Sequence, residues 1–95
     1  MSFQTVTEAR IDAITHAIGL LDIDLMLAVG EEVRRERLYH NARGRIAQAR
    51  ALIALFDAQD RAAGIAAEIT ALDQERRVLQ TGSAVYTHPA GEIVA

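Results

Sequence analysis

Two groups of acidic residues and histidines have the spacing that a helix needs to hold a metal ion. They are Glu32, Glu36 and His40 in one group and Asp12 and His16 in the other. Residues four apart lie on one face of a helix, where carboxylate and imidazole groups can coordinate a divalent cation. Arg35 and Arg37 flank the first group, however, and they would repel a cation while offering ion pairs to the carboxylates. We therefore expect no bound metal and no other cofactor.

Residues for covalent or acid–base catalysis are scarce. The chain has no cysteine, and it has no glycine-rich loop that could cradle a phosphate before a helix. Asp22 and Asp24 are two residues apart, so on a helix their side chains diverge. They are better suited to fix the register with another helix through charge pairs than to act together as a catalytic carboxylate pair. His16 falls on the same helical line as Leu20 and fits an interface histidine hydrogen-bonded to Asp12. The sequence thus predicts a protein that is not an enzyme.

The basic residues are all arginine, and they are concentrated in one short part of the chain. The formal net charge is −5 over residues 1–33, +5 over residues 34–50 and −3 over residues 51–95. The candidate anion-binding residues of the basic part are Arg34, Arg35, Arg37, Arg43, Arg45 and Arg50. Arginine suits bidentate contacts with phosphate or carboxylate, so this part could bind nucleic acid or an acidic protein surface.

A structural interpretation of the same arginines is also open. Arg34 and Arg35 can pair with Glu31 and Glu32 on their own helix, and the acidic part of a neighbouring copy could neutralise the others. A nucleic-acid partner is not favoured, because the whole chain carries a net charge of −3 and aromatic residues make up only 4%.

The first element predicted is a helix over residues 6–39. Thr5 and Glu8 form a capping box, which places the helix start at Val6. One apolar stripe follows at alternating intervals of three and four residues and then adds two further intervals of four, and it consists of Ile11, Ile14, Ile18, Leu21, Leu25, Val29 and Val33. A second stripe on the other side consists of Leu20, Ile23, Met26 and Leu27. Because one partner helix cannot cover both stripes, we predict that the second stripe is an interface with another subunit.

A turn over residues 40–44 and a second helix over residues 45–81 complete the predicted hairpin. Asn41 can end a helix, Gly44 can adopt a positive φ, and Gly82 is a natural residue to follow the helix end. The stripe of the second helix comprises Leu55, Ala58, Ala62, Ile65, Ile69, Leu72, Arg76 and Leu79, preceded on a slightly rotated line by Ile46, Ala49, Ile53 and Phe56. Two other arrangements are open: three helices with a break near Gly64, or a single uninterrupted helix.

Residues 83–95 contain Pro89, glycine and β-forming residues without helical periodicity, and they predict an extended C-terminal arm. Two interpretations of this arm are a disordered terminus and a segment that clasps a neighbouring subunit. The apolar residues that would make the second contact are Val85, Tyr86, Ile93 and Val94.

The sequence as a whole favours an all-α protein, a long antiparallel two-helix hairpin resembling a coiled coil, with an extended arm, that assembles into a helical bundle. With 95 residues and no cysteine it cannot bury a large core or use disulfides. We expect a cytoplasmic or virion subunit of a bacterial or bacteriophage assembly whose partners are further copies or other protein subunits. No membrane span is expected, because Asp22 and Asp24 interrupt the most apolar window. The other function left open is a binding module that uses the arginine-rich turn.

Overall fold

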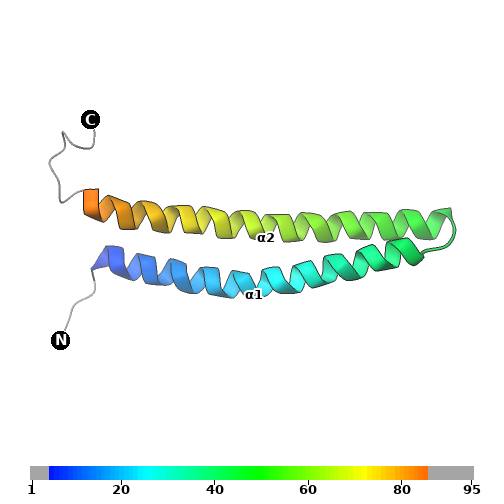
Figure 1. The fold of residues 1–95 in the computed structure, drawn as a ribbon, viewed down its shortest axis with the longest axis horizontal. Coiled ribbons are helices and arrows are strands. Elements are labelled where there is room, and N and C mark those ends of the chain that lie inside the picture. The colour runs from blue at the N-terminus through cyan, green and yellow to red at the C-terminus, as the bar shows by residue number, and fades with distance from the viewer. Residues whose placement is uncertain (1–4, 86–95) are drawn as a thin grey trace.

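The computed structural model describes residues 5–85, and the surroundings of side chains over residues 5–82. It contains two helices, α1 (Val6–Asn41) and α2 (Arg45–Val85), which run antiparallel and lie side by side along their length (Figure 1). At 1.5 Å per residue they are about 54 and 62 Å long. The predicted all-α hairpin is therefore confirmed. Neither the break near Gly64 nor a single uninterrupted helix is present.

Local capping fixes where α1 begins and where the chain turns. The Thr5 hydroxyl accepts a hydrogen bond from the Glu8 amide at 3.0 Å, as the capping box predicted. After Asn41, the Ala42 amide donates to the Tyr39 carbonyl at 3.2 Å. Gly44 has a φ of +89°, which a residue with a Cβ adopts only at a cost. Its carbonyl accepts from the Gln48 amide at 2.9 Å and so starts α2.

The helices extend further than the sequence predicted. Helix α1 continues from residue 39 to Asn41, so the turn shortens to residues 42–44. Helix α2 continues through Gly82 to Val85, so residues 83–85 belong to the helix and not to an arm. Gly82 has no positive φ, and no proline occurs before position 89 to end the helix there. The rest of the predicted arm lies outside the described residues.

A seam of small and aliphatic side chains joins the two helices. From α1 it takes Ile11, Ile14, Ile18, Leu21, Leu25 and Ala28, and from α2 it takes Leu55, Ala58, Ala62, Ile65, Ile69, Leu72, Arg76 and Leu79; all are buried or half-buried. Intervals of three and four residues alternate on both helices, as in a coiled coil. The long stripe predicted for α2 from Leu55 onwards is confirmed.

Two parts of the predicted stripes do not face the partner helix. On α1 the seam continues from Leu25 to Ala28, which leaves Val29 and Val33 44% and 48% exposed. The predicted stretch of four-residue intervals was therefore wrong, because a small alanine keeps the regular three–four alternation and lets the backbones approach. On α2 the line preceding Leu55 turns outwards, and its members Ile46, Ala49, Ile53 and Phe56 are exposed.

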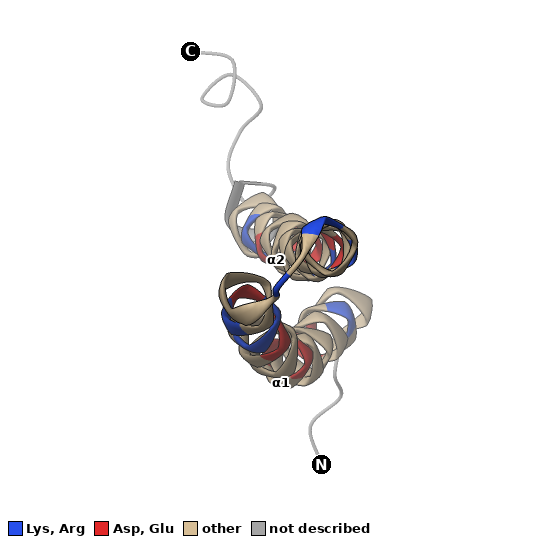
Figure 2. Ribbon diagram, turned by 90° about the vertical axis from the view of Figure 1, so that its right-hand side faces the viewer, with Lys and Arg blue, Asp and Glu red and all other residues tan. Residues whose placement is uncertain are grey.

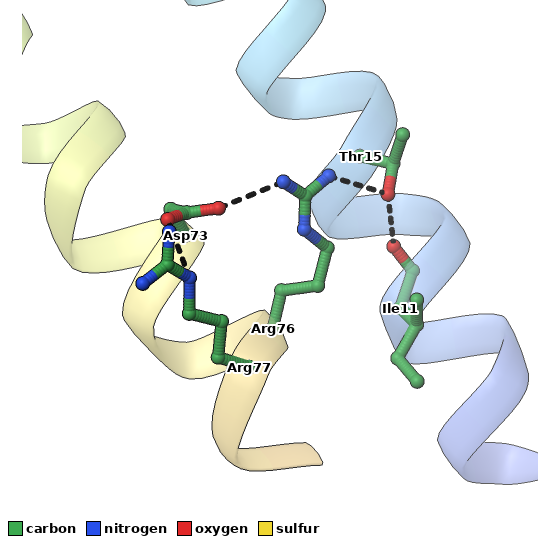
Figure 3. A network of polar contacts seen from close by, with 5 residues as sticks. All are labelled: Ile11, Thr15, Asp73, Arg76 and Arg77. Atoms are coloured by element: carbon green, nitrogen blue, oxygen red, sulfur yellow. Dashed lines mark hydrogen bonds and ion pairs between the residues drawn. The ribbon is translucent and has the colours of Figure 1, made fainter. Parts of the chain in front are cut away.

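Polar contacts between the helices lie near their open end. The Arg10 guanidinium pairs with Glu75 at 2.6 Å. Arg76, a member of the seam, donates to the Thr15 hydroxyl at 3.1 Å and pairs with Asp73 at 2.8 Å (Figure 3). Asp73 also forms an ion pair with Arg77 at 3.1 Å, while Thr15 donates to the Ile11 carbonyl. These contacts help to fix the register of the two helices.

Candidate functional site: exposed apolar surface and arginine tip

The hairpin covers little of its own apolar surface. The buried residues among those described are Ile14, Ala28, Leu55, Ala58 and Ala62, and three of these five are alanine. Twelve large hydrophobic side chains of the described residues stay exposed. They include the predicted interface residues Leu20, Ile23, Met26 and Leu27, at 54%, 57%, 74% and 69%. A two-helix layer has no third element to cover them.

The seam divides the remaining surface into two broad faces. In an antiparallel pair with this repeat, residues that directly precede a seam residue meet on one side, and residues that directly follow one meet on the other. The contacts bear this out: Arg10 and Glu75 each precede a seam residue and pair with each other, whereas Thr15 and Asp73 each follow one and both contact Arg76. We call the first side the preceding face and the second side the following face.

An apolar patch spans both helices on the following face. Its members are Met26, Val29, Val33, Leu52 and Phe56. Met26, Val29 and Phe56 directly follow seam residues, and Val33 and Leu52 follow Glu32 and Ala51, half-buried positions that continue the same three–four repeat towards the turn. Four of the five are 44–74% exposed, while Leu52 is half-buried. Ala28 and Ala58 lie opposite each other in the antiparallel pair. Along the helices, Val29 is therefore at the level of Phe56, and Val33 is at the level of Leu52. We call this set the apolar patch.

The preceding face is charged at the same level. Glu31, Asp57 and Arg61 line two adjoining shallow grooves there, of about 290 and 240 Å³. Their floor is made by alanines, Ala28, Ala54 and Ala58, and Leu27 stands at the rim. At the level of these grooves the following face therefore carries the apolar patch, whereas the preceding face carries three charged side chains beside Leu27.

The arginine tip comprises the six arginines predicted as an anion-binding set, and the structure divides them into two kinds. Arg34 and Arg35 both pair with Glu31, at 2.6 and 2.7 Å. The hydrogen bonds from Arg34 and then Arg35 lower the pKa of the Glu31 carboxyl below its usual value of 4.5. These two arginines are thus satisfied on their own helix, as the structural interpretation predicted.

The other four arginines of the tip, Arg37, Arg43, Arg45 and Arg50, are exposed and form no ion pair with the described residues. They lie on the connection and the adjoining turns, where basic residues gather at the closed end of the hairpin (Figure 2). The first turn of α2 contains no acid to offset them. Because a cation at a helix N-terminus is disfavoured by the helix dipole, local helix stability does not account for Arg45.

The two spacings considered for a metal do not build a site in the described part of the chain. No group of three or more metal-binding side chains is present there. His40 instead lies 3.8 Å from Glu36, an ion-pair distance when the histidine is protonated. Of the predicted interface residues in the C-terminal segment, Val85 ends α2, and Tyr86, Ile93 and Val94 lie outside the described residues.

Sequence reasoning missed the apolar patch. The apolar stripes of the sequence assign Val29, Val33 and Phe56 to the contact between the helices, and Leu52 belongs to neither stripe. The available signal was the uninterrupted three–four alternation through Ala28, which assigns its neighbours to the outside.

No family model, no curated protein and no solved structure matches the chain. Helix α1 is long and apolar enough to cross a membrane by length and composition, with a mean hydropathy of 1.6 in its most apolar window and 11% of that window buried. Core helices of soluble proteins and signal sequences meet the same criteria.

Proposed function

We propose that the chain is a non-enzymatic helical subunit that associates with further copies of itself to form a helical bundle. The observation that carries this proposal is the exposed apolar surface of both helices: among the described residues, twelve large hydrophobic side chains are exposed against a buried set of five residues. Apolar side chains that are exposed side by side, as in the apolar patch, are typical of an interaction site. A second hairpin is a suitable cover, because it brings the same three–four repeat.

Insertion of α1 in a membrane explains the apolar surface less well. Asp22 and Asp24 lie in the middle of the apolar stretch, and each aspartate costs about 2.5–3.5 kcal/mol at the centre of a spanning helix. Association in water involves no transfer of these groups into lipid, and both carboxylates are exposed in the hairpin.

The experiment is the absolute mass of the purified chain by light scattering, without detergent, at low and high salt. An oligomer whose mass does not fall in high salt supports association through apolar surface, because salt strengthens apolar burial and weakens ion pairs. A particle of 10.4 kDa at every concentration overturns the proposal.

A second candidate function is favoured by Arg37, Arg43, Arg45 and Arg50, which have no ion pair with the described residues. In this function the arginine tip binds a polyanion or an acidic protein surface. The same measurement with a nucleic-acid oligomer added tests it: a shift in mass at low salt that disappears at high salt supports binding by the tip. No shift at either salt concentration counts against nucleic acid as the partner.

A further inference from the structure

We propose that the apolar patch is the surface on which the second copy docks, face to face. This inference rests on the proposed self-association and names its face. The patch is the set defined above, Met26, Val29, Val33, Leu52 and Phe56.

The choice of face follows from the cost of burying charge. Docking on the preceding face would cover Glu31, Asp57 and Arg61, which line its grooves at this level. Charged groups lose hydration when they are covered, and a contact that leaves them unpaired is expensive. The following face offers five apolar side chains at the same level, so it gains by the same burial.

The area available matches what a stable dimer needs. With the centre of the patch near Gly30 and the tip near Ala42, two hairpins centred on the patch overlap over at least about 25 residues of each helix, or about 37 Å. Two packed helices are roughly 20 Å wide, so each copy covers on the order of 700 Å². Stable interfaces bury about 800 Å² per partner.

The test of the face compares two substitutions at exposed positions of α1. Val33→Asp lies in the apolar patch, and Leu27→Asp lies on the preceding face at a similar level and with greater exposure, 69% against 48%. The masses of both variants are measured by light scattering, and circular dichroism verifies that both remain helical. We expect Val33→Asp to be a monomer at concentrations where Leu27→Asp is still a dimer, with a shift in dissociation constant of at least tenfold between them.

The possible outcomes separate the two proposals. A dimer that dissociates with Leu27→Asp and survives Val33→Asp overturns the assignment of the face, while self-association stands. A wild-type chain that is always monomeric overturns the proposed function, and this inference with it.

Discussion

Ile14 is the most deeply buried large side chain described, at 3% exposure, and its replacement by alanine gives a direct measure of the seam. Ile14→Ala removes three buried carbon atoms, each of which contributes about 0.8 kcal/mol, for a total near 2.4 kcal/mol. The cavity left behind adds to this cost, and the better helix propensity of alanine offsets about 0.4 kcal/mol. We therefore expect a loss of about 2.5 kcal/mol in the free energy of unfolding.

The matched control is Ile46→Ala. Ile46 is 72% exposed on α2, so its substitution removes little buried apolar surface and costs little stability. The better helix propensity of alanine offsets most of that cost. We expect a change within about 0.5 kcal/mol of zero.

Thermal unfolding is followed by far-UV circular dichroism at one protein concentration, because self-association makes the melting temperature depend on concentration. For a chain of this size, we expect Ile14→Ala to lower the melting temperature by roughly 10–20 °C and Ile46→Ala to lower it by no more than about 4 °C. Equal melting temperatures for the two variants would refute the seam and the register on which both proposals depend.

Three further predictions concern the turn, acid stability and the tip. Gly44→Ala destabilises the hairpin by about 1–2 kcal/mol because Gly44 has a positive φ. Gly64→Ala stabilises it by about 0.5–1 kcal/mol, since the added Cβ meets open space and alanine favours a helix. Urea unfolding in which both substitutions change stability in the same direction would contradict this. The folded-state pKa of Glu31 is lowered, so its contribution to stability is present above the unfolded value of 4.5 and is lost as the pH falls through the folded value. Glu31→Gln should therefore weaken the pH dependence of the urea midpoint of unfolding between about pH 5 and pH 3. The same pH dependence in the variant and the wild type would refute the role given to Glu31. Arg43→Glu combined with Arg45→Glu keeps the helical circular dichroism signal and abolishes any salt-sensitive shift with nucleic acid; loss of helicity would mean that these arginines hold the turn itself.

Features governed by local sequence were predictable. The capping box at Thr5 and the need for glycine at position 44 depend on a few neighbouring residues, and the structure has both. The pairing of Arg34 and Arg35 with Glu31 is likewise set by helical spacing alone.

Features that depend on the choice between near-equivalent residues were not predictable. At the end of the α1 stripe, either Ala28 or Val29 could continue the seam, and hydrophobicity alone favours valine. Packing favours alanine there because Ala58 lies opposite and the helices approach closely. That single choice turns Val29 and Val33 outwards and creates the apolar patch.

The helix end at Val85 escaped prediction for a different reason. Gly82 is a frequent helix terminator, but it costs only about 1 kcal/mol inside a helix. Neighbouring residues can offset that amount, so α2 continues past it. Pairing across the hairpin, such as Arg10 with Glu75, requires the register of both helices and is not visible in either segment alone.

The central claim is that the hairpin associates with a second copy through apolar surface, and the most direct test is the absolute mass of the chain in solution. Light scattering in high salt and without detergent should give twice the 10.4 kDa of one chain, or a larger multiple, and the value should persist on moderate dilution. A mass of 10.4 kDa for a fully helical chain at all concentrations would contradict the claim.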